Sequence, residues 1–250
     1  MLFDVITIFP QFFDSTLSVG FLKRALDKKI IKVRITDLRD FTTDRHRTVD
    51  DRPFGGGRGM VLKPEPIFKA VEAVRRSEDE GRTAVILLSP QGRPFRQQEA
   101  ERLSKKEQII LICGRYEGVD ERVRQQLITE EISSGDYVLA GGELPALVVM
   151  ESVTRLLPSA VGSPQSLVDE SFCQGILDFP CYTRPASFRG MRVPEVLLMG
   201  NHEEIKRWRK RKALENTLRK RPNLLARAQL DSEAVKMLAK LKEELNLSSK

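Results

Sequence analysis

The chain contains 250 residues, of which 40% are hydrophobic and 31% are charged, a composition typical of a globular protein. We expect neither a membrane span, which needs roughly 20 apolar residues, nor a signal peptide. Three cysteines without a Cys-X-X-Cys pair and only two histidines argue against a disulfide framework and a Cys/His zinc site, and they favour a cytoplasmic location. The net charge is +7, and all of the excess lies in residues 201–250, which hold 14 basic and 7 acidic residues, whereas the first 200 hold 28 of each. We therefore expect the C-terminal region to bind a polyanion, and the most common such partner is nucleic acid.

The first 157 residues are predicted to alternate strands with helices. Continuous apolar runs predict buried strands, a 3.6-residue spacing of apolar side chains predicts helices, and polar, Gly-rich residues predict a loop. In chain order the predicted elements are a strand at 2–9, a helix at 17–28, a half-exposed strand at 32–37, a loop at 40–62, a helix at 64–80, a strand at 84–88, a helix at 99–106, a strand at 109–113, a helix at 119–127, a short strand at 137–140 and a helix at 146–157. This order predicts an α/β domain with a largely parallel sheet.

The rest of the chain shows a different pattern. Residues 158–179 contain Gly, Ser, Pro and Gln, have little periodicity and are interpreted as a linker. A helix is predicted to begin at Asn201, with a capping-box pattern, and to end before Pro222. Asp231 is predicted to cap a last helix, whose inward-facing side chains are Val235, Leu238, Leu241 and Leu245. We therefore expect a small helical domain after the linker.

Each of three inner strands is followed by a loop suited to ligand binding, at residues 89–92, 114–118 and 131–145. Glycines in these loops would let another molecule approach the backbone closely. Ligands of open α/β sheets bind outside the carboxyl ends of the strands. The three loops together predict one small-ligand pocket, although each by itself is compatible with an ordinary tight turn. A P-loop sequence is absent, and the glycines at 55–59 do not complete a Gly-X-Gly-X-X-Gly pattern, which argues against ATP and dinucleotides.

Six longer strings carry a resemblance to a known family. They are DRHRTVDDRPFGGGRGM, LLSPQGRPF, CGRYEGVDER, SSGDYVLAGGELPA, ILDFPCYTRP and VPEVLLMGNHEEIKRWR. In this order, and over nearly the whole chain, they resemble the bacterial tRNA (guanine-N1)-methyltransferases of the TrmD type. The resemblance implies a SPOUT-type α/β domain at 1–160 with a deep trefoil knot near 85–142, a flexible linker at 161–178 and a small all-helical tRNA-binding domain at 179–250. It also implies methyl transfer from S-adenosylmethionine to N1 of the guanosine at tRNA position 37, and a homodimer whose active site is shared between subunits.

The resemblance further implies that the loops of the knot bind S-adenosylmethionine, largely through backbone groups. The implied cofactor-binding residues are Leu88, Ser89, Pro90, Gln91, Gly92, Gly114, Arg115, Tyr116, Glu117, Gly118, Ser133, Ser134, Gly135, Asp136, Tyr137, Val138, Leu139, Gly141, Gly142 and Pro145. Backbone binding is physically reasonable because knotted loops are preorganised. The family's magnesium requirement has no obvious ligand cluster in this sequence, so no metal ligand is assigned.

The implied chemistry requires a base, because N1 of neutral guanine carries a proton. The family's base is an Asp directly before Ser-Phe, but here Glu170 occupies that place and Asp169 comes one residue earlier. The alignment favours Glu170 over Asp169, and the alternative for either is a solvated linker carboxylate. Arg155 matches the family's helper arginine, which would stabilise charge that develops near O6. A surface ion pair with Glu151 is the structural alternative for Arg155.

The predicted second-last helix is densely basic. Its cationic residues are Lys206, Arg207, Arg209, Lys210, Arg211, Lys212, Arg219, Lys220 and Arg221. Like charges repel, so this run favours phosphate neutralisation, although a solvated face is the usual alternative. Trp208 is expected in the core and not as a base-stacking platform. By resemblance, Arg184, Asn201 and His202 lie near the tRNA anticodon arm. From the basic run, Lys206, Arg209, Lys210 and Lys212 are added as predicted RNA contacts.

Two other functions stay open from the sequence. One is a SPOUT enzyme that methylates a different RNA position, against which the ILDFPCYTRP string and the C-terminal region argue. The other is a non-catalytic RNA-binding protein that has kept the fold, which only the altered base position at Asp169 and Glu170 favours.

Overall fold

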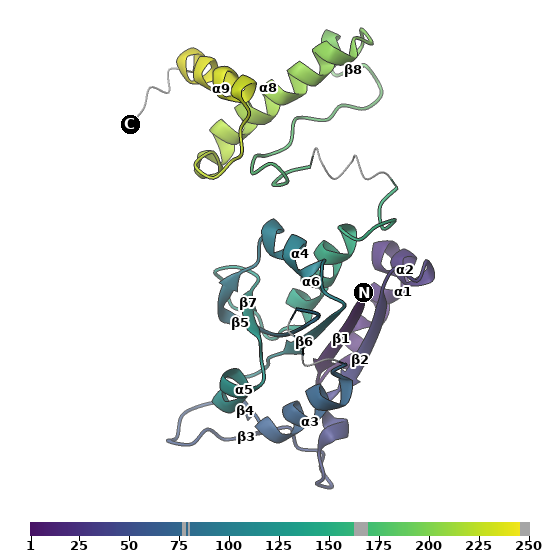
Figure 1. The fold of residues 1–250 in the computed structure, drawn as a ribbon, viewed down its shortest axis with the longest axis vertical. Coiled ribbons are helices and arrows are strands. Elements are labelled where there is room, and N and C mark those ends of the chain that lie inside the picture. The colour runs from purple at the N-terminus through teal and green to yellow at the C-terminus, as the bar shows by residue number, and fades with distance from the viewer. Residues whose placement is uncertain (77–78, 80, 163–169, 246–250) are drawn as a thin grey trace. The chain divides into compact units, whose positions relative to one another are not determined.

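The computed structural model (Figure 1) describes residues 1–76, 79, 81–162 and 170–245. The chain forms two compact units, Met1–Gly162 and Ser163–Lys250. Two clusters of buried apolar side chains form the core of unit 1, and a third, smaller cluster forms that of unit 2.

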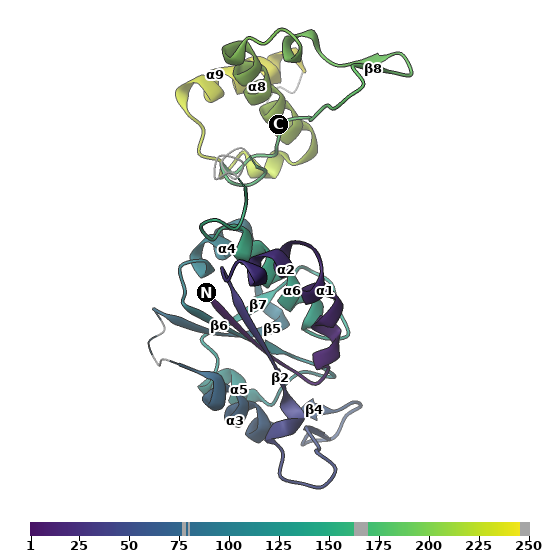
Figure 2. The same ribbon diagram turned by 90° about the vertical axis from the view of Figure 1, so that its right-hand side faces the viewer.

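Unit 1 is built around a five-stranded sheet whose strands all run parallel (Figures 1 and 2). In spatial order the strands are β2 (Lys32–Asp37), β1 (Leu2–Thr7), β6 (Gln108–Cys113), β5 (Thr83–Pro94) and β7 (Glu130–Ser133). Every residue of β1 and β6 is buried, as expected of parallel strands that are covered on both faces. The predicted α/β class with a parallel sheet is confirmed.

Helices cover both faces of this sheet (Figure 2). The helical segments of unit 1 are η1 (Pro10–Phe13), α1 (Asp14–Ser18), α2 (Gly20–Asp27), η2 (Leu38–Phe41), α3 (Pro64–Val74), α4 (Gln97–Leu103), α5 (Glu121–Gln126) and α6 (Glu143–Arg155). One core joins α2, α4 and α6 to Val5 of β1, and the other joins α3 and α5 to the next residue, Ile6. Successive side chains of a strand point to opposite faces, so β1 contributes to both cores.

The segment predicted as a polar loop at 40–62 contains a short antiparallel pair, β3 (Asp50–Asp51) and β4 (Val61–Leu62). The end of this hairpin is bonded to the loop that follows β6. The Glu117 N–H donates to the Met60 carbonyl (3.0 Å), and the Leu62 N–H donates to the Gly118 carbonyl (3.0 Å). The Gly-rich hairpin is thereby attached to the second of the three predicted loops.

Two predictions near the strand ends require correction. The predicted strand at 137–140 is wrong, because these residues form a loop after β7 in which Val138 is 84% exposed. The predicted loop at 89–92 lies within the span of β5, yet it interrupts the strand pairing. Leu88 and Arg93 are both in register with Ile132 of β7, so the four residues between them bulge out of the ladder.

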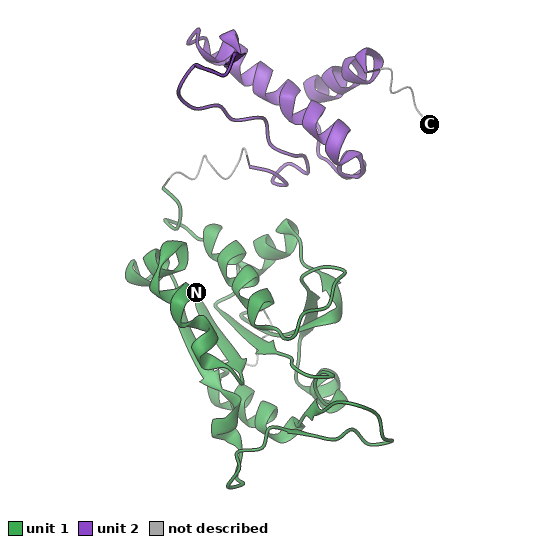
Figure 3. Ribbon diagram, turned by 180° about the vertical axis from the view of Figure 1, so that it is seen from behind, with its two compact units in different colours: residues 1–162 green, residues 163–250 purple. Residues whose placement is uncertain are grey.

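The described part of unit 2 contains the α-helices α8 and α9, two short 3-10 helices and a small hairpin (Figure 3). Its elements are β8 (Ser187–Phe188), β9 (Met191–Arg192), η3 (Glu195–Leu197), α8 (His202–Lys220), η4 (Pro222–Leu224) and α9 (Ser232–Glu244). The hairpin is a departure from the all-helical C-terminal domain that was predicted. Strands of two residues are too short to leave a periodic pattern in the sequence, so the hairpin could not be predicted. Asn201 and Asp231 cap α8 and α9 as predicted, each accepting a hydrogen bond from a backbone N–H of the first turn.

The described end of the predicted linker contacts α8. The Leu177 N–H donates to the Thr217 hydroxyl (2.9 Å), and the Asn216 side chain donates to the Asp178 carbonyl (2.9 Å). In the described part of the chain, no helix is both long and apolar enough to cross a lipid bilayer.

Candidate functional site

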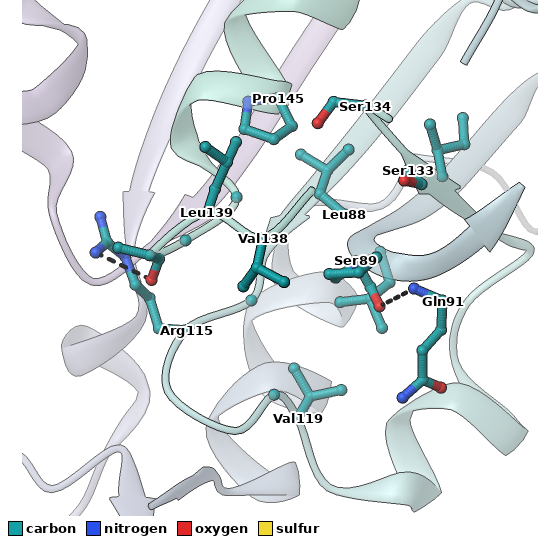
Figure 4. A pocket seen from close by; sticks show the side chains of 18 of the residues that line it. Leu88, Ser89, Gln91, Arg115, Val119, Ser133, Ser134, Val138, Leu139 and Pro145 are labelled. Atoms are coloured by element: carbon teal, nitrogen blue, oxygen red, sulfur yellow. Dashed lines mark hydrogen bonds between the residues drawn. The ribbon is translucent and has the colours of Figure 1, made fainter. Parts of the chain in front are cut away.

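The loops that follow β6 and β7 and the bulge of β5 meet around one cavity in unit 1 (Figure 4). The cavity has a volume of about 230 Å³ and lies at the carboxyl ends of the inner strand β6 and the edge strand β7, beside the bulge of β5. Its described lining residues are Leu87, Leu88, Ser89, Pro90, Gln91, Gly114, Arg115, Tyr116, Glu117, Gly118, Val119, Arg124, Ile132, Ser133, Ser134, Tyr137, Val138, Leu139, Ala140, Gly141, Gly142 and Pro145. The three segments therefore converge, as the rule for ligand sites in open α/β sheets predicts.

All but three of the residues predicted to bind a cofactor line this cavity, and the exceptions are Gly92, Gly135 and Asp136. The lining residues that were not predicted from the sequence are Leu87, Val119, Arg124, Ile132 and Ala140. Four of them lie directly beside a predicted residue or inside a predicted loop, so extending each motif by one residue would have found them. Arg124, on α5, carries no such signal.

Glycine is required where the third loop meets the second. The Gly142 N–H donates to the Gly114 carbonyl (3.0 Å), and a Cβ at Gly142 would lie 2.7 Å from the Cα of Cys113. A side chain there would separate the two loops, because bonded backbone segments leave it no room. Burial, assisted by the nearby Glu143 carboxylate, raises the pKa of the Cys113 thiol. The buried position of this cysteine therefore favours the neutral thiol over the reactive thiolate.

A buried ion pair joins the second and third loops to the sheet. Glu143, the first residue of α6 and only 1% exposed, accepts hydrogen bonds from Arg115 Nε (3.0 Å) and from the Thr7 hydroxyl (2.7 Å). The Arg115 guanidinium also donates to the Ala140 carbonyl (3.3 Å) and lies 4.5 Å from the centroid of the Phe9 ring. The N-terminus of α6 further favours the negative charge of Glu143. One carboxylate thus connects the end of β1 with both loops of the cavity.

The predicted catalytic residues lie in different units. Arg155 is the last residue of α6, is partly buried and is not among the described lining residues of the cavity in unit 1. Glu170 belongs to unit 2, where it lines a cavity of about 580 Å³ together with His202 and Lys206. Asp169 lies outside the described residues. The structure therefore groups Glu170 with predicted RNA contacts of unit 2.

Carboxylates partly neutralise the basic face of α8. Lys210 Nζ lies 2.7 Å from Asp231 and 2.8 Å from Glu233, and Lys212 Nζ lies 2.8 Å from Glu215. Burial alone would lower the pKa of Lys210, but its hydrogen bonds to the two acids outweigh this effect and raise the pKa. Phosphate would have to compete with these carboxylates, so the two lysines are weaker candidates for RNA contacts than their sequence suggests.

The other predicted RNA contacts occupy three kinds of position in unit 2. Asn201 caps α8, and His202 and Lys206 line the cavity that contains Glu170. Arg184 lines a further cavity of about 600 Å³. Arg209 lines both of these cavities. The structure thus divides the predicted contacts between a helix cap and two hollows.

Among the residues that the structure describes, no three His, Cys, Asp or Glu side chains are grouped so that they could hold a metal ion.

Comparison with known proteins gives one consistent family. The family model described as tRNA (Guanine-1)-methyltransferase TrmD matches residues 1–227. A protein of Dictyoglomus turgidum is 55% identical over 242 residues, which cover 97% of each chain. A protein of Moorella thermoacetica is 53% identical over 238 residues (95% of each chain), and one of Staphylococcus carnosus is 51% identical over 245 residues (98% of this chain and 99% of the relative). All three relatives are named tRNA (guanine-N(1)-)-methyltransferase.

Proposed function

Because this chain belongs to the tRNA (guanine-N1)-methyltransferase family, we propose that it transfers a methyl group from S-adenosylmethionine to N1 of the guanosine at position 37 of tRNA, beside the anticodon. The general reaction, methylation of guanosine N1 in tRNA, follows from the family itself. The observation that carries the proposed methyl donor is the cavity in unit 1, because all of its described lining residues except Arg124 and Ile132 come from the three strings that correspond to the family's cofactor loops.

The cavity is suited to the adenosine part of S-adenosylmethionine. Gly114, Gly141 and Gly142 line it without side chains, so a ligand can approach the backbone and bond to it. Leu88, Val138 and Leu139 supply apolar surface for an adenine ring, and Figure 4 shows the three side chains around the same hollow. When bound there, S-adenosylmethionine would supply a methyl group that its positive sulfur already activates.

The residues of the chain then have to activate guanine. We assign Glu170 as the general base, which takes the N1 proton while the N1–methyl bond forms and the sulfur–methyl bond breaks. Arg155 is assigned to guanine O6, where a guanidinium offsets the negative charge that develops as the proton leaves. The cavity that groups Glu170 with His202 and Lys206 supports the assignment, because basic side chains there could hold the RNA near the carboxylate.

The finer architecture of the family is proposed for this chain as well. Residues 85–142 would form the trefoil knot, and the short backbone contact between Gly142 and Gly114 is consistent with it. The chain would act as a homodimer in which the cofactor loops of one subunit meet the linker and unit 2 of the other. Exposed apolar side chains on unit 1, among them Leu144 and Val148 of α6, support the presence of such an interface.

One assay tests the proposed reaction. The protein is incubated with S-adenosylmethionine labelled in its methyl group and with tRNA transcripts that carry guanosine or adenosine at position 37, and the product nucleoside is mapped. We expect label at N1 of guanosine 37 and none in the adenosine transcript. No transfer to either tRNA would indicate a non-catalytic RNA-binding protein. Transfer that does not depend on position 37 would indicate an enzyme for another RNA position.

A further inference from the structure

Unit 2 contains a cavity whose aromatic walls have no role in the proposed reaction, although two predicted RNA contacts, Arg184 and Arg209, also line it. Its volume is about 600 Å³, and two of its walls are the rings of Tyr182 and Trp208. The ring centroids lie 6.4 Å apart and the ring planes make an angle of 53°. Tyr182 is 50% exposed, and Trp208 is only partly buried, contrary to the expectation that it belongs to the core. Packing within the protein therefore leaves part of each ring accessible to a ligand.

The charge of this cavity favours a polyanion. None of its described lining residues is acidic, whereas Arg184 and Arg209 are both among them. The Arg209 guanidinium lies over the ring of Phe179, 4.8 Å from the centroid, and this contact orients its N–H donors. Among the described residues, Arg209 forms no ion pair with a carboxylate. Aromatic faces beside oriented guanidinium groups are the combination with which proteins hold single-stranded nucleic acid, because rings stack on bases and guanidinium groups bind phosphates.

The aromatic cavity adjoins the cavity that contains Glu170. Phe179, Ile205 and Arg209 line both hollows. A nucleotide bound beside the target guanosine could therefore place its base between the aromatic walls and its phosphate near Arg209. Because three residues line both hollows, a nucleotide in the aromatic cavity would be a close neighbour of the target guanosine in the same loop of RNA.

We propose that the cavity between Tyr182 and Trp208 binds one unpaired base of the tRNA anticodon loop, close in sequence to the guanosine that is methylated. The inference rests on the proposed function, since it takes tRNA as the ligand. The rings of Tyr182 and Trp208 would stack on the base. This contact would help to hold the anticodon loop open while the neighbouring guanine reaches Glu170. The cavity would recognise the anticodon loop through the shape and the stacking of one of its nucleotides.

Trp208 is the single tryptophan of the chain, so its fluorescence reports on this cavity alone. The full-length protein is titrated with anticodon stem-loop RNAs, each of which carries an abasic nucleotide at a different loop position. We expect the intact RNA to quench the fluorescence and one abasic position to abolish most of the quenching. Equal quenching by every abasic RNA, or no quenching by an RNA that binds in a filter assay, would overturn the proposal and leave the cavity to a protein partner.

A pair of variants tests the same cavity through affinity. Tyr182→Leu removes the stacking ring, and we expect it to weaken tRNA binding about 5- to 100-fold, whereas Tyr182→Phe keeps the ring and should bind like the wild type. Binding of S-adenosylmethionine, which unit 1 is proposed to provide, should be unchanged in both variants. Equal tRNA affinity of Tyr182→Leu and wild type would refute the base pocket. The wild-type protein is assayed for methylation of guanosine 37 in parallel. If it methylates this guanosine, refutation of the base pocket would leave the proposed function intact.

Discussion

At the scale of single residues, Glu143 is the group on which the geometry of the unit 1 cavity depends most. Its carboxylate is buried, and its two oxygens are shared between Arg115 and Thr7. A buried ion pair adds little stability when both partners are present, but removing one partner leaves the other charge without compensation. Arg115 would lose its anchor while its guanidinium remained next to the third loop.

We therefore expect Glu143→Gln to lower the free energy of unfolding by about 2–4 kcal/mol and to weaken the binding of S-adenosylmethionine. The matched control is Thr7→Val, which keeps the ion pair but removes the hydroxyl that donates to the same carboxylate and accepts from the Phe9 N–H. It should cost about 1–2 kcal/mol with little change in cofactor affinity. Urea unfolding and isothermal titration calorimetry measure the two quantities. Equal effects of the two variants on cofactor binding would show that the charge of Glu143 does not position the loops.

At the scale of elements, the sequence predicts what periodicity and caps record. Buried strands such as β6 are continuous apolar runs, and the caps at Asn201 and Asp231 follow from side chains that can accept a backbone hydrogen bond. The run at 137–140 imitates a strand because a ligand cavity needs apolar side chains as much as a core does. Val138 is one of them, and it lines the cavity in Figure 4.

Other features of the structure were not predicted because they depend on contacts between residues that are distant in the sequence. In α9 the inward position predicted for Val235 is taken by Ala234, because the side that packs on α8 is set by the partner helix. The ion pairs that neutralise Lys210 come from Asp231 and Glu233, which no local pattern connects with α8. Residues of the site that belong to one loop were predictable, whereas partners across the fold were not.

Asp231 links the two helices of unit 2, and it makes this contact depend on pH. Its carboxylate caps α9 and also accepts hydrogen bonds from Lys210 of α8. The Lys210 ammonium, together with the backbone N–H of Ala234, holds the pKa of Asp231 below its usual value. A lowered folded-state pKa means that the contribution to stability is complete above the unfolded pKa of about 3.9 and is lost as the pH falls through the lower folded value.

Asp231→Asn keeps a good helix cap but removes the charge. We expect the variant to have a lower Tm than the wild type at about pH 5–7, and the difference to shrink below about pH 4, where Asp231 of the wild type also becomes protonated. Thermal melts followed by circular dichroism across this range measure the difference. About 1 M salt at neutral pH should reduce it as well, because the pair is exposed. A difference that stayed constant down to about pH 3 would contradict an electrostatic origin.

At the scale of the whole molecule, the two halves of the proposed chemistry belong to different units. The cofactor cavity lies within unit 1, and Glu170 lies within unit 2. A homodimer could complete a site either within one chain or between two chains. The proposed arrangement, in which the cavity of one subunit meets Glu170 of the other, has a consequence that mixed dimers can reveal.

Two variants inactivate the two halves separately. Val138→Arg adds a cation to the cavity at an exposed position, so it should repel the positively charged cofactor without disturbing the core. Glu170→Gln should still bind S-adenosylmethionine but should lose methyl transfer, whereas Asp169→Asn should remain active. The opposite result for the two acids would move the role of general base to Asp169.

The decisive measurement is the activity of the two inactive variants after they are unfolded, mixed in equal amounts and refolded together. If each site takes its cavity from one subunit and its base from the other, a mixed dimer has one site with both defects and one intact site. Random pairing makes half of the dimers mixed, so we expect about a quarter of wild-type activity per chain. If each site lies within one chain, every site of every dimer carries a defect and the mixture stays inactive. Size-exclusion chromatography and cofactor binding by the Glu170→Gln parent establish that both variants are folded dimers, so an inactive mixture would count against the shared site.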